Sequence, residues 1–324
     1  MNALAKRLRA ALDQLHQAGT YKQLKYLTAP MGPTTTIEGV GEVLVFCANN
    51  YLGLANDPEV VEAGHDGLRR YGAGTASVRF ICGTFDCHRA LEARIAKFLG
   101  AEAALTYVSC WNANEGLLTN LVQEGDLILS DELNHASIID ATRLARQATR
   151  KIFGHADLQS LEAQLQACAD APVKVVVTDG VFSMEGDIAP LDEMVAVCRR
   201  YEATLVVDDS HATGVLGRHG RGTHEHFQLP GHAPSGIDIF TGTLGKALGG
   251  AAGGYVAGPQ DLIDTLVQRS RPQLFSNALP PTVAVSAAKA LEILEREPQR
   301  VAQLQANVTR MRDGLRALDY DVLD

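Results

Sequence analysis

Short apolar segments alternate with amphipathic segments along most of the chain. The apolar segments, which have the length of buried strands, lie at 103–108, 126–131, 173–179, 204–209 and 237–243. The segments with helical periodicity lie between them, at 111–122, 136–147, 157–168 and 190–201. Short apolar strands that alternate with helices favour a mostly parallel sheet covered on both faces. The pattern therefore predicts an α/β fold whose ligands bind beyond the carboxyl ends of the strands.

The two ends of the chain have different patterns. An amphipathic helix is predicted at the start, with a stripe formed by Leu4, Leu8, Leu12 and Leu15. An extended hairpin follows, with Gly39 and Gly41 at its turn. From about residue 259 the pattern becomes helical, and residues 319–324 are expected to enter another strand.

Composition and charge exclude several classes of protein. The 324 residues carry a net charge of −9, which argues against a general nucleic-acid binder. We expect no membrane span, because no long uncharged apolar run occurs. Six scattered cysteines without a CxxC pair indicate a reducing, cytoplasmic compartment. The cationic first helix makes a targeting segment, and hence the mitochondrial matrix, the minor alternative.

One lysine, Lys246, lies among glycines directly after a predicted strand, in TGTLGKALGGAAGGY. A phosphate-binding P-loop would need glycine in place of Phe240 and Ser or Thr in place of Ala247, so a nucleotide site is disfavoured. A glycine-rich turn with an exposed lysine is one interpretation. The other is a Schiff-base lysine, since glycines let the backbone approach a bulky cofactor and an amine can bond to an aldehyde.

Two aspartates and a histidine follow another strand, in VVDDSHATG. A strand-end turn is one interpretation, but two carboxylates there are costly to bury without a cationic partner. Side chains alternate along a strand, so one of Asp208 and Asp209 can face a site while the other serves the structure. A protonated pyridine nitrogen is such a partner, and together with a Schiff-base lysine it is typical of a pyridoxal phosphate site.

Two further segments supply weaker signals. His135 opens a predicted helix in SDELNHASIID, where it is either a cap or packing residue or an imidazole stacked on a cofactor ring. Ser109, Cys110 and Trp111 begin another helix, where free backbone N–H groups can bind phosphate. We expect no metal, because the clustered histidines lack ligand spacing; they are His219, His224 and His226.

Taken together, these motifs and several others resemble the α-oxoamine synthases. The further motifs are CANNYLGLANDP, ASVRFICGT, TDGVFSMEG and QRSRPQLFSN, and the resemblance runs from about residue 20 to the end. It implies a fold-type I, pyridoxal phosphate-dependent transferase that condenses an amino acid with an acyl-CoA. The motif ASVRFICGT resembles that of one branch of the family. The enzymes of this branch condense glycine with acetyl-CoA to 2-amino-3-oxobutanoate and CoA, or cleave that ketoacid in threonine catabolism. A 7-keto-8-aminopelargonate synthase-like enzyme and a cofactor-binding chain without activity are the alternatives.

The resemblance assigns a catalytic role to four residues. It implies that Lys246 forms the Schiff base with the cofactor and that Asp208 pairs with the pyridine nitrogen. It also implies that His211 contacts the phenolic oxygen and that His135 stacks on the ring.

The resemblance places other residues around the cofactor and substrate. They are Ser109, Cys110, Trp111, Ser183 and Thr243 at the cofactor, Ser276 at the phosphate in the neighbouring subunit of a homodimer, and Asn50 near the substrate carboxylate. We expect an N-terminal helix and hairpin at 1–45 and a large cofactor-binding domain at 46–280. We expect residues 281–324 to be the start of a small C-terminal domain that is incomplete here, because members of the family run on beyond this point and carry their substrate-carboxylate arginine there.

Overall fold

The computed structural model describes residues 2–231 and 236–323, which form two compact units divided after Cys47. The N-terminal unit contains α1 (Ala3–Gln17), β1 (Thr34–Ile37) and β2 (Gly41–Leu44). The two strands pair antiparallel, and Gly39 and Gly41 adopt the positive φ angles that their turn requires. The predicted helix and hairpin are therefore confirmed.

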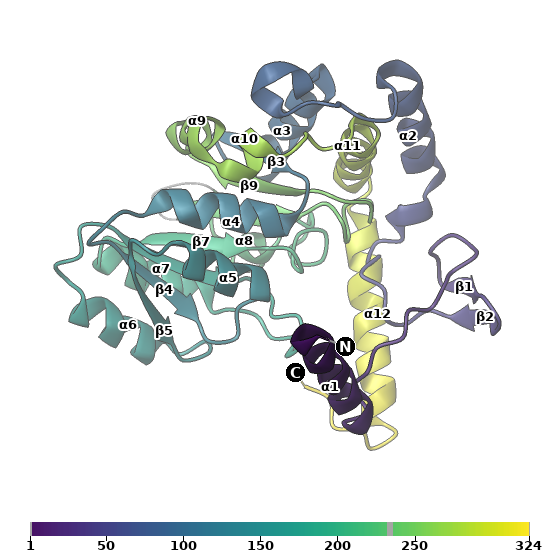
Figure 1. Ribbon diagram of the computed structural model, residues 1–324, viewed down its shortest axis with the longest axis horizontal. Helices are drawn as coiled ribbons and strands as arrows, with labels where there is room; N and C mark the ends of the chain where they lie inside the picture. The colour runs from purple at the N-terminus through teal and green to yellow at the C-terminus, as the bar shows by residue number, and fades with distance from the viewer. Residues whose placement is uncertain (1, 232–235, 324) are drawn as a thin grey trace. The chain divides into compact units, whose positions relative to one another are not determined.

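The second unit is built on a seven-stranded sheet with the order β3–β9–β8–β7–β6–β4–β5 (Figure 1). The strands are β3 (Ala103–Tyr107), β4 (Leu127–Asp131), β5 (Thr149–Phe153), β6 (Lys174–Asp179), β7 (Thr204–Asp208), β8 (Ile239–Thr243) and β9 (Gly254–Gly258). Strands β8, β7, β6, β4 and β5 are parallel, whereas β9 is antiparallel to both of its neighbours. The carboxyl ends of β3, β4, β6, β7 and β8 therefore lie at the same edge.

Two strands are absent from the sequence-based prediction. β5, with the sequence TRKIF, lies at the edge of the sheet and is largely exposed, so it lacks the apolar run of a buried strand. β9, with the sequence GYVAG, is buried but short, and its glycines merge into the preceding glycine-rich loop. Both strands are recognised only through their backbone partners.

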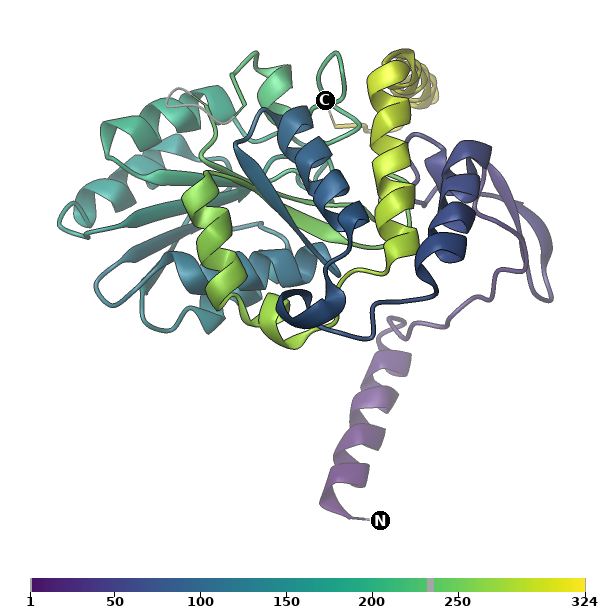
Figure 2. The ribbon, with the colours of Figure 1, turned by 90° about the horizontal axis from the view of Figure 1, so that it is seen from above.

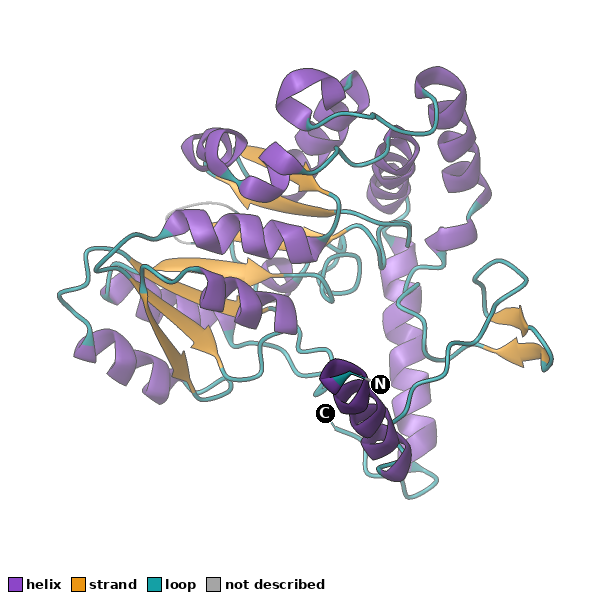
Figure 3. Ribbon diagram, in the orientation of Figure 1, coloured by secondary structure: helices purple, strands orange, loops and turns teal. Residues whose placement is uncertain are grey.

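Helices cover both faces of the sheet, as Figures 2 and 3 show. The helices of this unit are α2 (Pro58–Tyr71), α3 (Asp86–Leu99), α4 (Cys110–Leu121), α5 (Ala136–Leu144), α6 (Leu158–Ala167), α7 (Leu191–Arg200), α8 (Thr223–His226), α9 (Gln260–Arg269), α10 (Arg271–Phe275), α11 (Pro281–Arg296) and α12 (Gln299–Arg316). Two short helical turns, η1 (Leu54–Asn56) and η2 (Arg79–Gly83), precede α2 and α3 respectively. None of the described helices is long and apolar enough to cross a membrane.

Alternation along the strands creates two separate hydrophobic cores. Val175 and Val177 of β6 belong to the core that includes side chains of α4, α5 and α9. Val176 belongs to the opposite core, which includes side chains of α3, α6, α7 and α11. Because both faces are buried, the strands read as continuous apolar runs.

The predicted final strand is wrong for the residues that the structure describes. Tyr320–Leu323 follow the last turn after α12 and take part in no ladder. A strand depends on backbone hydrogen bonds to a neighbour, and these residues pair with none of the described strands.

A histidine connects two loops at the carboxyl edge. His155 lies between Asp131 and Asp187, with nitrogen–oxygen distances of 3.1 and 2.8 Å. Its ring also packs edge-on against Phe182. Burial alone would lower the pKa of His155, but the two carboxylates raise it above its ordinary value.

We predict that His155 makes the stability of the fold depend on pH. Its pKa is higher in the folded than in the unfolded chain, so its contribution is fully present below the unfolded value of about 6.5. The contribution is lost as the pH rises through the folded value. Urea unfolding across this range should show a free energy of unfolding that falls with pH, and His155→Gln should flatten that fall. An unchanged slope in the variant would contradict the assignment.

Candidate active site

A cavity of about 190 Å³ lies where the strands of the sheet end. Its walls are formed by Cys110, Trp111, His135, Ser137, Asp179, Asp208, Ser210, His211, Thr243 and Lys246. These residues come from the segments that follow β3, β4, β7 and β8 and from the ends of β6, β7 and β8. The structure thus brings together seven of the residues that the sequence singled out, as the strand-end rule predicts.

Asp208, the last residue of β7, is buried at the base of this cavity. Its Oδ1 accepts a hydrogen bond from the backbone N–H of Ser210 at 3.0 Å, and its Oδ2 accepts one from Asn114 Nδ2 at 2.7 Å. Burial alone would raise the pKa of Asp208. Hydrogen bonds from Ser210 and Asn114, together with the charge of Lys246, outweigh burial and lower the pKa below its ordinary value. The carboxylate is therefore ionised inside the protein.

The neighbouring Asp209 has a different role. Its carboxylate accepts hydrogen bonds from the Thr223 backbone N–H at 2.9 Å and from the Thr223 hydroxyl at 2.6 Å. It is fully buried, and burial raises its pKa to about 7. Asp209 therefore holds the start of α8, while Asp208 alone faces the cavity.

Lys246 lies in the turn after β8. Thr243 shapes this turn, because its hydroxyl accepts from the Gly245 backbone N–H at 3.1 Å and donates to the Gly253 carbonyl at 3.2 Å. The Lys246 amine reaches His211 Nε2 at 2.7 Å. Burial lowers the pKa of Lys246, and the Asp208 carboxylate opposes this only in part. The amine is therefore easier to deprotonate than that of an ordinary lysine.

Tyr51 belongs to the site but does not stand out in the sequence. Its hydroxyl lies 2.9 Å from His211 Nδ1 and donates to Asn49 Oδ1 at 3.1 Å. Burial and the nearby Lys246 lower the pKa of His211 to about 4, so the ring is neutral. Tyr51 lies within CANNYLGLANDP, but nothing in that motif connects it to a histidine 160 residues away.

His135 is fixed at both its backbone and its ring. Its backbone N–H donates to Asp179 Oδ2 at 2.6 Å, and its Nδ1 accepts from the Ser137 backbone N–H at 3.2 Å. The ring lies edge-on to Trp111, with centroids 6.2 Å apart. Burial raises the pKa of Asp179 well above its ordinary value, and the adjacent Asp208 adds to the effect. Asp179 does not stand out in the sequence, because Ser183 is the residue of its segment, TDGVFSMEG, that the resemblance places at the cofactor.

The N-terminus of α4 faces the same cavity. Ser109 caps the helix, since its hydroxyl accepts from the Asn112 backbone N–H at 3.2 Å. Cys110 and Trp111 follow, and the backbone of Ser109 and Cys110 lies close to β9. A Cβ at Gly254 would meet the Cys110 nitrogen at 2.3 Å, so this approach requires glycine. The result is a helix N-terminus suited to an anion.

Four residues expected at the site lie outside the walls of this cavity, namely Ser109, which caps α4, and Asn50, Ser183 and Ser276. Asn50 Oδ1 accepts from the Ala55 backbone N–H at 3.0 Å, which gives it a local structural contact. Ser183 is exposed in the turn after β6, and Ser276 lies directly after α10. Their roles stay predictions, and that of Ser276 concerns a neighbouring subunit.

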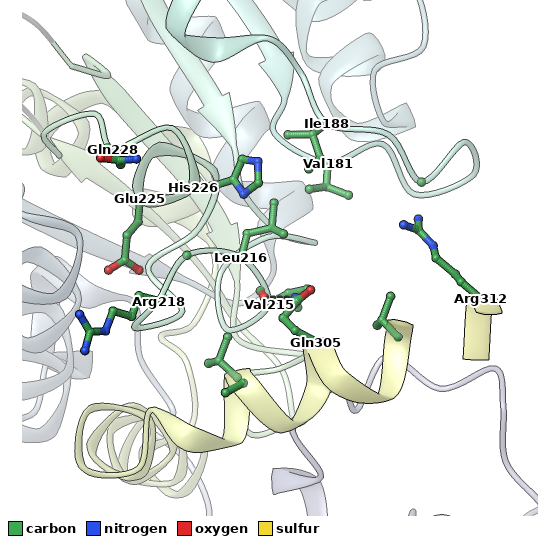
Figure 4. A pocket seen from close by; sticks show the side chains of 15 residues that line it. Val181, Ile188, Val215, Leu216, Arg218, Glu225, His226, Gln228, Gln305 and Arg312 are labelled. Carbon is green, nitrogen blue, oxygen red and sulfur yellow. Dashed lines mark hydrogen bonds between the residues drawn. The ribbon is translucent and has the colours of Figure 1, made fainter. Parts of the chain in front are cut away.

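A larger cavity of about 890 Å³ lies elsewhere in this unit (Figure 4). Val181 and Ile188 line one side, and Gln305 and Arg312 of α12 line another. Its acidic residue, Glu225, is already bound by His219 and by the backbone N–H groups of His219 and Arg221. The described residues that line this space include Glu225 and His226 but no lysine, serine or cysteine that could act as a nucleophile, so the smaller cavity is the candidate active site.

The groups in the smaller cavity fit pyridoxal phosphate. An ionised Asp208 suits a protonated ring nitrogen, and the Lys246 amine suits the aldehyde. The N-terminus of α4 suits the phosphate, and the imidazole of His135 suits a ring face. Each functional group of the cofactor thus has a counterpart among the residues present.

The chain is similar to proteins of known activity and structure. It is 46% identical over 316 residues to the mitochondrial 2-amino-3-ketobutyrate coenzyme A ligase of Homo sapiens, covering 97% of this chain and 74% of that protein. It is 43% identical over 308 residues to 8-amino-7-oxononanoate synthase 1 of Bacillus velezensis, covering 95% and 77% respectively. A serine palmitoyltransferase from S. paucimobilis, solved with a bound PLP–myriocin aldimine, superimposes with a TM-score of 0.91 at 30% identity, covering 99% of this chain and 82% of that one.

Most of the chain also matches the model of a protein family. Residues 41–324 match the model of aminotransferase class I and II. The match spans the whole sheet and every residue of the cavity. The chain therefore belongs to the aminotransferase class I and II family.

Proposed function

We propose that this chain is a pyridoxal phosphate-dependent acyltransferase. It condenses glycine with acetyl-CoA to 2-amino-3-oxobutanoate and CoA, and it runs the reverse cleavage in threonine catabolism. The observation that carries the proposal is the half-buried amine of Lys246, placed 2.7 Å from a neutral His211 in a cavity that also holds an ionised Asp208. The similarity to the human 2-amino-3-ketobutyrate coenzyme A ligase supports the choice of substrates.

When bound, pyridoxal phosphate supplies an aldehyde that takes up an amine and a ring that accepts the electrons released at Cα. Lys246 would hold the aldehyde, and Asp208 would hold the ring nitrogen in its protonated form. The first turn of α4, with Ser109, Cys110 and Trp111, would bind the phosphate. The imidazole of His135 would cover one face of the ring.

Proton transfer would depend on the same lysine. A base must reach the Cα proton of glycine, and the lowered pKa of Lys246 makes its amine more readily available as that base than the amine of an ordinary lysine. His211 Nε2 lies within hydrogen-bonding distance of the amine and orients it. Because His211 is neutral, it adds no positive charge that would compete with the ammonium group for Asp208.

One observation favours an acyl donor other than acetyl-CoA as the alternative. The 8-amino-7-oxononanoate synthase of Bacillus velezensis is nearly as similar to this chain as the human ligase is. The mass of the product formed from acetyl-, succinyl-, pimeloyl- and palmitoyl-CoA decides between the two. A chain that binds the cofactor without catalysis would give a visible absorption band but no glycine-dependent release of CoA.

We also propose a cytoplasmic homodimer whose active sites share residues. Ser276 is connected to the ASVRFICGT segment, because Val78 and Asn277 form a backbone bridge. Around this bridge Phe80, Ile81 and Phe275 are exposed by 60%, 69% and 74%. Exposed apolar side chains of this size favour a protein interface. Such an interface would bury roughly 2,000 Å² or more.

We predict that Lys246 carries the cofactor. Borohydride reduction should fix a pyridoxyl group on the peptide that contains Lys246. Lys246→Ala should lower turnover at least roughly 100-fold, because Lys246 is the one lysine among the described residues that line the cavity. Lys289→Ala is the matched control, since Lys289 pairs with Glu292 on α11 and should leave labelling unchanged. Label on any other lysine would overturn the assignment.

We predict opposite consequences for the two adjacent aspartates. Asp208→Asn should lower turnover by roughly 100- to 1,000-fold while some cofactor stays bound, because a neutral amide cannot stabilise a protonated ring nitrogen. Asp209→Asn should lower thermal stability instead, since Asp209 holds Thr223. Steady-state kinetics and melting curves of both variants test this. A nearly fully active Asp208 variant beside an inactive Asp209 variant would reverse the roles.

We predict that mixed dimers regain activity. Lys246→Ala and Ser276→Trp chains are each expected to be inactive. In mixed dimers both lesions can fall in one site and leave the other intact, so activity should partly return when the chains are refolded together. The control is either chain refolded alone. Continued inactivity of the mixture, with dimers formed, would contradict a shared site, as would a cofactor-loaded monomer of the unsubstituted chain.

A further inference from the structure

A buried asparagine connects Asp208 to His135. Asn114 lies on α4, one turn after the start of the helix, and is 1% exposed. Its Nδ2 donates to Asp208 Oδ2 at 2.7 Å and to Ser137 Oγ at 3.0 Å. A longer contact of 3.8 Å reaches Cys110 Sγ. The two short bonds use both hydrogens of the amide.

The orientation of this amide is determined by charge. If Asn114 were turned over, its carbonyl oxygen would face the carboxylate of Asp208, and two acceptors would be left in contact. Because Asp208 is buried and ionised, that arrangement would leave a buried charge without its donor. Nδ2 must therefore face Asp208.

The second hydrogen of the amide continues the connection toward His135. The Ser137 backbone N–H donates to His135 Nδ1, which fixes that nitrogen as an acceptor. Ser137 Oγ lies 2.7 Å from the same nitrogen and therefore donates to it. Its oxygen is then left to accept from Asn114. Asn114 thus donates one hydrogen bond directly to Asp208 and one to Ser137, and Ser137 in turn donates to His135.

We propose that Asn114 is a positioning residue that links Asp208, the residue for the ring nitrogen, to the imidazole of His135 through Ser137. Asn114 contacts neither reacting atom itself. It fixes the carboxylate of Asp208 and the imidazole of His135 relative to each other, and these two groups would meet the edge and the face of one cofactor ring. The inference rests on the proposed cofactor cavity, but it also makes a prediction about the protein without cofactor.

The sole tryptophan of the chain reports on this link. Trp111 lies edge-on to His135, so its fluorescence in the cofactor-free protein responds to the position of the imidazole. Asn114→Ala and Ser137→Ala should each change the emission of Trp111. In the double variant the change should not exceed that of a single variant, because the two bonds act in series. Asn120→Ala is the matched control, since Asn120 lies on the same helix and donates to Gly116 instead.

Cofactor binding tests the other end of the link. Asn114→Ala should raise the dissociation constant of pyridoxal phosphate by roughly 10- to 100-fold, the cost of a lost hydrogen bond to a charged group. Asn114→Asp has the same shape but places a carboxylate against Asp208, so it should bind more weakly than Asn114→Ala. If Asn114 only filled space, Asn114→Asp would instead bind the cofactor more tightly than Asn114→Ala.

The outcomes separate this inference from the proposed reaction. The inference is overturned if Asn114→Asp binds the cofactor as tightly as the unsubstituted protein. It is also overturned if the changes in Trp111 emission of Asn114→Ala and Ser137→Ala add in the double variant, or if Asn120→Ala gives the same change in emission. Should Asn114→Ala fail to fold, Ser137→Ala alone still tests the link, and unchanged Trp111 emission would overturn it. Failure of the unsubstituted protein to condense glycine with acetyl-CoA would instead contradict the proposed function. It would not affect the emission and cofactor-binding tests of the role of Asn114.

Discussion

The ionised carboxylate of Asp208, buried at the end of β7, is the constraint on which the site depends. A buried charge is stable only when donors and an opposite charge surround it. Here Ser210, Asn114 and Lys246 supply them, each from a different element. The sheet determines where these elements end, and one carboxylate stays stable because β7, β8 and α4 bring their donors and charge to the same point.

The same arrangement prepares the lysine for chemistry. Lys246 is close enough to Asp208 for attraction but buried enough that its pKa falls. His211, held by Tyr51 on its other side, approaches the amine without carrying a charge. A half-buried amine, a neutral imidazole and an ionised carboxylate thus coexist in about 190 Å³ because each has a different source of stabilisation. That combination suits a cofactor with both an aldehyde and a basic ring nitrogen.

The alternation of strands and helices was predictable because both faces of the sheet are buried and the strands are apolar throughout. β5 and β9 were not, since an exposed edge strand and a short glycine-bounded strand carry little periodic signal. Tyr320–Leu323 show the converse error, because a strand-like sequence forms no strand without a backbone partner. Local pattern specifies what a segment can form, and pairing decides whether it does.

The sequence by itself determined the α/β class, and it singled out Lys246 and a pair of aspartates of which one can face a site. Those features follow from short-range pattern: apolar runs, glycines beside Lys246, and carboxylates that directly follow a strand. Only the tertiary structure decided that Asp208 faces the cavity while Asp209 holds α8, and that Asn114 and Tyr51 belong to the site. These contacts join residues 94 and 160 positions apart, and no local pattern encodes which distant side chain will satisfy a buried charge or ring. That choice is made when the strands pair and their carboxyl ends meet.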